Sequence, residues 1–91
     1  MILAKYYLIR GRVQGVGYRF FAREAARRHK IVGYVRNLPT GGTVEVHAEA
    51  TEDALRLFKN ELKQGPPAAY VDDIEESDAD VSGHFSAFSV R

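Results

Sequence analysis

The chain has 91 residues, a length that suits one domain and is too short for two, so we expect a single domain over residues 1–91. A hydrophobic share of 45% and a charged share of 27% are typical of a soluble globular protein, and no apolar run is long enough to span a membrane. The chain contains no cysteine, which excludes disulfides, a thiol nucleophile and thiolate metal ligands. Since the N-terminus has no secretory signal either, we expect a cytoplasmic protein.

The net charge of +1 hides an uneven distribution along the chain. Residues 1–36 carry nine Lys or Arg and one acidic residue, whereas residues 37–91 carry four Lys or Arg and eleven acidic residues. A near-neutral chain with a basic first third is not typical of a bulk nucleic-acid binder. It is typical of a protein whose local positive field attracts a small anion.

The first half of the chain predicts two strands and a helix. Apolar residues alternate with others over residues 5–13, which predicts a strand, and two glycines break it at residues 14–18. An apolar side opposite a basic side predicts a helix over residues 19–30, and a second strand is expected over residues 31–37. A proline and two glycines then predict a turn at residues 38–42.

The second half predicts three more strands and a second helix. The most regular alternation in the chain predicts a strand over residues 43–50. Thr51 is a suitable N-cap for a helix over residues 51–64, whose apolar stripe is Leu55, Phe58 and Leu62. A strand with an acidic outer face is expected over residues 71–76, and a short terminal strand over residues 85–90.

This order predicts an α+β fold, a ferredoxin-like α/β sandwich of the βαββαβ type with a short fifth strand. Two helices are expected on one face of an antiparallel sheet. Right-handed crossovers lead us to expect the strand order 4-1-3-2, with the first and third strands side by side and parallel. The pattern does not place the fifth strand.

The break between the first strand and the first helix is a candidate anion site. Gly15 and Gly17 permit unusual backbone dihedrals, so several N–H groups can turn toward one point at the helix N-terminus. Arg19 can fold its guanidinium over the same point, and its planar fork matches phosphate oxygens. Taken alone, the Gly-x-Gly spacing favours a tight turn over an anion site, and it matches neither the Walker nor the dinucleotide pattern.

Asn37 closes the second strand, just before the turn. Its amide both donates and accepts hydrogen bonds, so it can hold a water molecule in a chosen orientation. Taken alone, however, a single Asn before a Leu-Pro turn favours a turn residue that bonds its own backbone.

Together these two segments resemble the acylphosphatase family, whose pattern is matched by Val13-Gln14-Gly15-Val16-Gly17-Tyr18-Arg19 and by Gly33-Tyr34-Val35-Arg36-Asn37. The resemblance extends to Gly65-Pro66-Pro67-Ala68 and to the closing Phe85-x-x-Phe88-x-Val90-Arg91, and so covers nearly the whole chain. The turn Thr40–Thr43 is one residue longer than is common in the family, which could alter access beside Asn37.

The resemblance implies hydrolysis of an acyl phosphate to a carboxylate and inorganic phosphate, with no metal and no cofactor. It implies that Arg19 binds the phosphate and that Asn37 positions the attacking water. The phosphate-binding loop it implies consists of Gly15, Val16, Gly17, Tyr18 and Arg19. We accordingly expect a monomer that binds a small acyl phosphate and inorganic phosphate, with no nucleic-acid or membrane partner.

Other functions have less support in the sequence. His29, His47 and His84 lack metal-ligand spacing; we expect His47 on the solvent face of its strand and His29 as a helix-end cation. An RNA reader of this fold needs aromatic residues on its third strand, and residues 43–50 have none. A non-catalytic module that binds phosphate or another anion remains the alternative.

Overall fold

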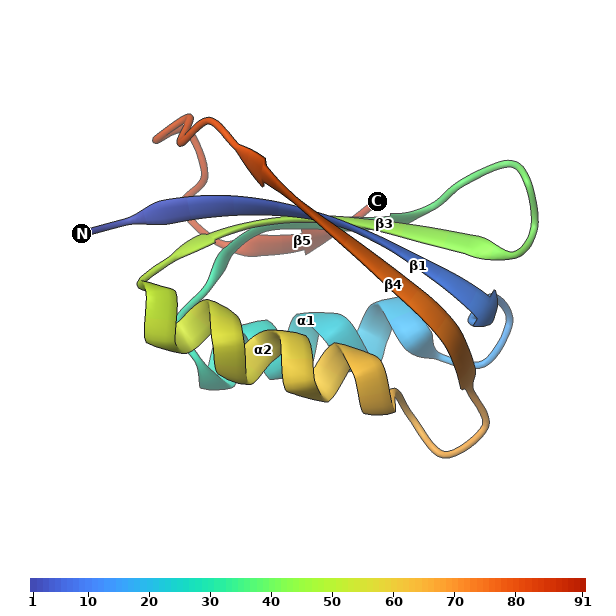
Figure 1. The fold of residues 1–91 in the computed structure, drawn as a ribbon. Coiled ribbons are helices and arrows are strands. Elements are labelled where there is room, and N and C mark those ends of the chain that lie inside the picture. Colours follow the sequence, from blue (N-terminus) through green and yellow to red (C-terminus); the bar gives the residue numbers. More distant parts are fainter.

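The computed structural model describes residues 1–91 and packs two helices against one face of a five-stranded sheet (Figure 1). The elements are β1 (Leu3–Arg12), α1 (Tyr18–Arg28), β2 (Val32–Asn37), β3 (Thr43–Ala50), α2 (Glu52–Gln64), β4 (Tyr70–Ala79) and β5 (Phe88–Val90). All seven predicted elements are confirmed. The largest differences in their bounds are at β4, which continues to Ala79, and at β5, which begins only at Phe88.

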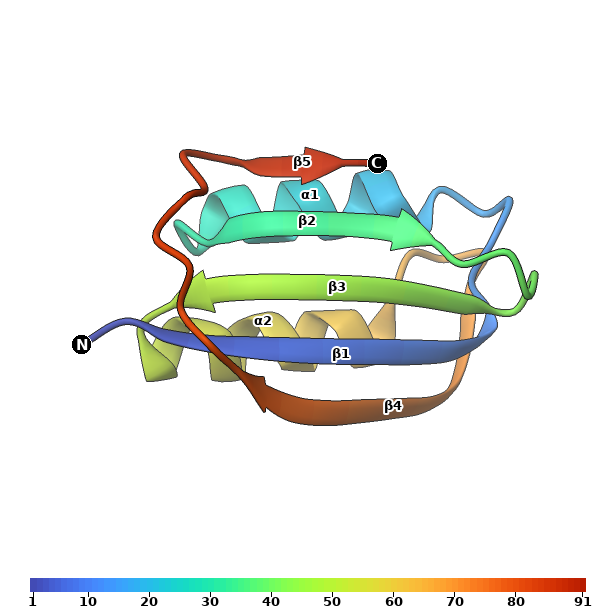
Figure 2. The same ribbon diagram turned by 90° about the horizontal axis from the view of Figure 1, so that it is seen from above.

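The strand order is β4-β1-β3-β2-β5, which Figure 2 shows from above the sheet. The predicted order 4-1-3-2 is confirmed. The fifth strand adds to the free edge of β2 and runs parallel to it, pairing Gly33 with Phe88 and Val35 with Val90. The sheet is therefore mixed rather than antiparallel throughout.

The predicted direction of one strand pair is wrong. β1 and β3 are neighbours, but they are antiparallel, with Leu3 opposite Ala50 and Arg10 opposite Thr43. The crossover through α1 makes β1 parallel to β2, whereas the turn at residues 38–42 reverses the chain between β2 and β3. Because β3 inserts between β1 and β2, it is antiparallel to both.

The core lies between the sheet and the two helices. Small residues let α1 approach the sheet closely, whereas the predicted stripe of α2 supplies larger side chains. Phe58 packs edge-on against Tyr7 and Phe88, with ring centroids 6.3 and 5.8 Å apart, and so joins α2 to β1 and β5. The fully buried residues include Tyr7, Ile9, Val13, Tyr18, Ala22, Ala25, Val35, Val44, Val46, Phe58 and Leu62.

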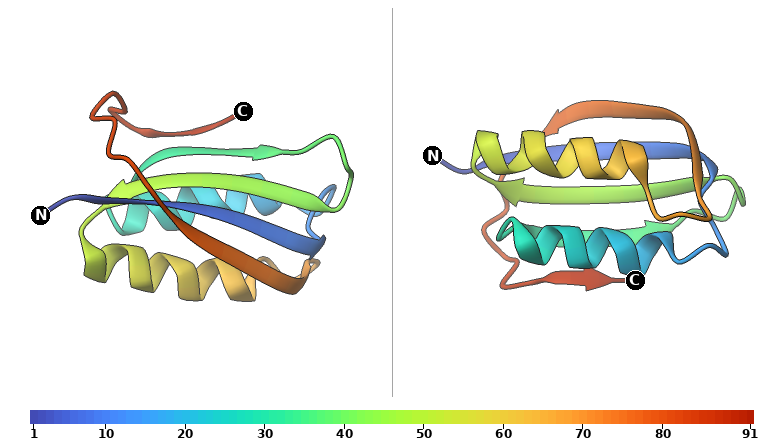
Figure 3. Two further views of the ribbon diagram at one scale, coloured as in Figure 1. Left: turned by 45° about the horizontal axis from the view of Figure 1, so that its top comes forward. Right: turned by 90° about the horizontal axis from the view of Figure 1, so that it is seen from below.

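The outer face of the sheet is partly covered by the connection from β4 to β5, which crosses it (Figure 3, left). His47 is therefore not the solvent-facing residue we expected: its side chain is 14% exposed, stacks on Tyr34 at 5.8 Å and packs against Phe85. Glu49, on the same strand, is buried under this connection and accepts hydrogen bonds from Ser82 and from the main chain of Gly83.

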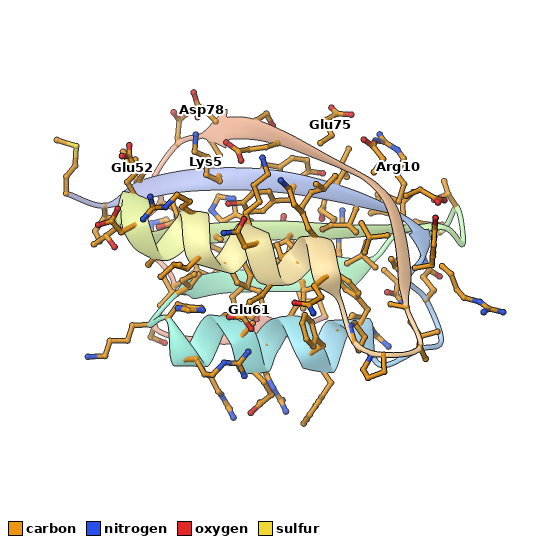
Figure 4. The ribbon with its side chains drawn as sticks, turned by 60° about the horizontal axis from the view of Figure 1, so that its bottom comes forward. Lys5, Arg10, Glu52, Glu61, Glu75 and Asp78 are labelled. Atoms are coloured by element: carbon orange, nitrogen blue, oxygen red, sulfur yellow. The ribbon has the colours of Figure 1, made fainter.

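Basic residues of β1 pair with the acidic residues predicted on β4. Figure 4 shows Lys5 beside Asp78 near one end of this strand pair and Arg10 beside Glu75 near the other, where the N–O distance is 3.2 Å. Exposed ion pairs of this kind contribute little stability. They do place opposite charges next to each other in the observed β1–β4 register. Neither helix has the length and apolar character needed to cross a membrane.

Candidate active site

The backbone between β1 and α1 adopts the unusual dihedrals that the two glycines permit. Gly15 and Gly17 have φ values of 73° and 78°, in the left-handed region. A Cβ atom at either position would meet no atom within 4 Å, so the dihedral angle, and not the available space, requires glycine here. The open space lies directly in front of the start of α1.

The start of α1 is a free donor site. Gly17 is the N-cap residue, and no side chain caps the helix. The carbonyl oxygen of Gly17 accepts from the amide of Phe21 at 3.0 Å, whereas the amides of residues 18–20 have no acceptor within the helix. No acidic residue lies in the first turn, so the positive end of the helix dipole is uncompensated.

A cavity of about 270 Å³ opens over this helix start. The residues that line it are Val13, Gly15, Gly17, Tyr18, Arg19, Phe20, Arg23, Asn37 and Val90. Two guanidinium groups and no carboxylate are among them, so the cavity suits an anion. The structure thus brings Arg19, Asn37 and the glycine loop together, although Val16 of the predicted loop packs against the core instead.

Asn37 reaches this cavity from the end of β2. Its Oδ1 atom is buried and has no hydrogen-bond partner. A buried carbonyl oxygen without a donor costs free energy, and it is expected where a water or a ligand pairs with it. The Asn37 side chain forms no bond that would identify it as a turn residue; the adjoining turn is closed instead by the amide of Leu38, which donates to the oxygen of Thr43 at 3.0 Å.

Gln14 joins the loop to this strand end, a role that sequence reasoning missed. Its Nε2 atom donates to the main-chain oxygens of Leu38 and Thr43, both at 2.9 Å. These two residues flank the β2–β3 turn, and Leu38 directly follows Asn37. The only signal in the sequence was the position of Gln14 between the last apolar residue of the strand and the first glycine.

Arg19 is held by Arg91, the residue after the C-terminal strand β5, which sequence reasoning also did not place in the site. Its Nη1 atom donates to the main-chain oxygen of Arg91 at 2.9 Å. The end of β5 lies beside the start of α1 (Figure 3, right). Arg91 is fixed in turn by its amide, which donates to Val35 at 2.8 Å, and by its guanidinium, 4.1 Å from the centre of the Tyr34 ring.

Tyr18 lines the cavity, and its side chain anchors the start of α1. The ring is fully buried, and its hydroxyl donates to the main-chain oxygen of Leu62 at 2.7 Å. Burial raises the pKa of this phenol, so it stays protonated and keeps the bond between the start of α1 and the end of α2. No cluster of three or more His, Cys, Asp or Glu side chains that could hold a metal occurs in the structure.

Comparison with known proteins identifies the family. The acylphosphatase family model matches residues 5–90. An acylphosphatase of Thermus thermophilus is 53% identical over 68 residues, 75% of this chain and 76% of that protein. An acylphosphatase of Dehalococcoides mccartyi is 42% identical over 84 residues, 92% of each protein.

A solved structure of similar fold agrees with these matches. The crystal structure of acylphosphatase from Bacillus subtilis superposes with a TM-score of 0.93 at 35% identity, covering 100% of this chain and 99% of that one. The comparisons give no support to the non-catalytic alternative. The chain, with its βαββαβ fold and the family model matching almost its whole length, belongs to the acylphosphatase family of hydrolases.

Proposed function

We propose that this chain hydrolyses the carboxyl-phosphate anhydride of small acyl phosphates, releasing a carboxylate and inorganic phosphate. The observation that carries the proposal is the convergence of three groups on one cavity. These are the uncapped start of α1, the guanidinium of Arg19 and the unpaired Oδ1 atom of Asn37. The first two suit a phosphoryl group, and the third suits a water molecule beside it.

The loop and Arg19 would bind the phosphoryl group. Amides at the helix start donate to its oxygens, and the guanidinium adds charge-assisted hydrogen bonds. Phosphoryl transfer depends mainly on positioning and on stabilising the charge of the equatorial oxygens. Donors that are fixed before the substrate arrives supply that stabilisation without reorganising. The proposed phosphate-binding loop is therefore Gly15, Val16, Gly17, Tyr18 and Arg19, with Val16 contributing only its backbone.

Asn37 would orient the attacking water, which donates a hydrogen bond to Oδ1. The water oxygen bonds to phosphorus as the bond from phosphorus to the acyl oxygen breaks, and that electron pair leaves with the carboxylate. Asn37 is not a base, so the water proton passes to an oxygen of the phosphoryl group itself. An acyl phosphate is an activated anhydride with a good leaving group, so no strong enzyme base is required.

We also propose that the protein acts as a cytoplasmic monomer without nucleic-acid or membrane partners. The absence of cysteine is compatible with a reducing compartment. The acidic residues of the edge strand β4 support the monomer, because charges on an edge discourage pairing with another sheet.

The test of the proposed function is phosphate release from benzoyl phosphate in metal-free buffer containing a chelator. The wild-type protein should release phosphate catalytically, and Arg19→Ala should lower kcat/KM by roughly 10³-fold because it removes the charged donor. Arg12→Ala is the matched control, since Arg12 is exposed and lies outside the cavity. A wild-type protein without turnover, or an Arg19→Ala variant as fast as the wild type, would contradict the proposal.

A further inference from the structure

A second guanidinium lies in the same cavity, and the proposed mechanism does not use it. Arg23 follows Arg19 by four residues on α1 and lines the cavity together with Phe20. Four residues of helix correspond to about 6 Å along the axis, so the two guanidiniums extend from successive turns of one face. If the phosphoryl group occupies the helix start, the acyl group has the remaining space beside Phe20 and Arg23.

The Arg23 side chain is fixed but retains unused hydrogen-bonding capacity. Its guanidinium carbon lies 4.9 Å from the centre of the Phe20 ring, a stacking contact that restrains its orientation. Its Nε atom is buried and has no hydrogen-bond partner. Because solvent does not reach this Nε atom, a ligand in the cavity would bind the two Nη atoms, which donate no hydrogen bond within the protein.

The nearest carboxylate does not satisfy this group. Glu24 places Oε2 at 3.4 Å from the Arg23 Nε atom without hydrogen-bond geometry. The same Oε2 atom accepts a hydrogen bond from Arg27 at 3.4 Å. This carboxylate is 39% exposed, so solvent screens its ion pair with Arg23, and it does not line the cavity.

We propose that Arg23 binds a second anionic group on the acyl part of the substrate. The preferred substrates would then be acyl phosphates that carry another anion, a carboxylate or a second phosphate, about one helical turn from the reacting phosphorus. This inference rests on the proposed function, because it assigns the acyl end of the same site. Arg23 is a specificity-determining residue in this account, and Arg19 remains the one that holds the reacting phosphoryl group.

Binding of stable phosphonates tests the inference without turnover. The probes are (3-carboxybenzyl)phosphonate and (3-carbamoylbenzyl)phosphonate, which have nearly the same size and differ in one negative charge. Isothermal titration should give the wild-type protein a preference for the carboxylate of about tenfold in Kd, as expected for a charge-assisted hydrogen bond. Arg23→Gln should reduce the ratio to about one, and Arg23→Lys should keep part of it, because the charge remains.

Arg27→Gln is the matched control. It removes the same charge from the same helix, and Arg27 shares Glu24 with Arg23 but does not line the cavity. The wild-type preference should persist in this variant. A wild-type ratio near one, a ratio that survives in Arg23→Gln, or an equal loss in Arg27→Gln would overturn the inference.

Turnover of the matching substrates separates this inference from the proposed function. The ratio of kcat/KM for 3-carboxybenzoyl phosphate and 3-carbamoylbenzoyl phosphate should follow the Kd ratio in every variant. If the wild-type protein hydrolysed both substrates at equal rates, the role of Arg23 would be contradicted, but the proposed function would not. Phosphonate binding with the Arg23-dependent preference, but no hydrolysis of any acyl phosphate, would contradict the proposed function and leave the second anion site supported.

Discussion

At the scale of single residues, the cavity is held together by side chains that bond to the main chain of a distant element. Gln14 binds the two ends of the β2–β3 turn, Tyr18 binds the end of α2, and Arg19 binds the end of β5. Each bond fixes a part of the loop relative to a different strand or helix. The distance between the glycine loop and Asn37 therefore depends on a few polar contacts. Gln14 makes the most direct of them, because it lies in the loop and bonds to Leu38, the residue after Asn37.

Replacing Gln14 with Leu should impair turnover more than binding. The change removes both donors to Leu38 and Thr43 with little change in volume, so the loop and the end of β2 lose their direct link. Because misplacement by about 1 Å can cost 10²-fold in rate, we expect kcat for benzoyl phosphate to fall by roughly 10–100-fold. The inhibition constant of inorganic phosphate should rise by much less.

Gln64→Leu is the control for this prediction, because Gln64 is exposed at the end of α2 and lies outside the cavity. Equal losses of kcat and phosphate affinity in Gln14→Leu would show that Gln14 holds the loop in shape and does not align it with Asn37.

At the scale of elements, the connection between β4 and β5 decides where the C-terminal strand lies. Glu49 on β3 is only 3% exposed, and it fastens this connection through hydrogen bonds from Ser82 and Gly83. Phe85 then packs on His47 and Tyr34, and β5 pairs with β2. Because Arg91 directly follows β5, the hydrogen bond from Arg19 to Arg91 depends on this placement of the strand.

Glu49→Gln should destabilise the fold in a pH-dependent way. Burial alone would raise the pKa of Glu49, but hydrogen bonds from His47, Ser82 and Gly83 outweigh it and lower the pKa to about 2 from an ordinary 4.5. The stabilisation is therefore fully present above about pH 4.5 and is lost as the pH falls toward 2. At pH 7 we expect Glu49→Gln to lower the free energy of unfolding by roughly 2 kcal/mol.

Urea unfolding of both proteins between pH 7 and pH 2 checks this. The difference between wild type and Glu49→Gln should shrink as the pH falls below 4.5. Glu75→Gln, which breaks an exposed pair with Arg10, should show only a small difference throughout. A difference between wild type and Glu49→Gln that does not change with pH would contradict the assigned charge state of Glu49.

The strands β1 to β4 and the two helices were predictable from the sequence, because each has a clear period. Thr51 caps α2 as predicted and accepts from the amide of Ala54 at 3.3 Å. The buried state of Glu49 was not predictable, since alternation assigns it to the solvent face and only tertiary structure brings Ser82 over it. The place of β5 was unpredictable for the same reason, as three residues pairing with a distant edge leave no periodic signal.

The candidate site was predictable where its residues adjoin in sequence and not where they are far apart. Gly15, Gly17 and Arg19 lie within five positions, and the family resemblance added Asn37. The bonds from Gln14 span 24 and 29 residues, and no local pattern indicates them. Arg23 looked like one charge among several on the polar side of α1, because the sequence does not show which of these charges faces the cavity.

At the scale of the whole molecule, the basic residues of the first third of the chain lie in two different places. Two arginines from this part of the chain line the cavity, and other basic residues lie on β1. The acidic residues of β4 neutralise those on β1. The net charge of +1 is thus compatible with a local positive field at the cavity. The Cα radius of gyration is 11.8 Å, as expected for a compact chain of this length.

The proposed monomer predicts a single small particle in solution. Small-angle scattering should give a radius of gyration of about 12–13 Å, slightly above the Cα value because side chains and hydration add to it. Light scattering should give a mass near 10.2 kDa that does not rise with protein concentration. A mass near twice this value at micromolar concentration would show that copies associate.

We propose above all that Asn37 orients the attacking water and that the loop binds the phosphoryl group. The most direct measurement compares kcat for benzoyl phosphate with the inhibition constant of inorganic phosphate in Asn37→Ala. We predict that kcat falls by roughly 10²–10³-fold, the usual cost of removing one positioned amide, while the inhibition constant stays within about threefold of the wild-type value. A variant that keeps the full rate, or one that loses phosphate affinity in proportion to kcat, would contradict the account.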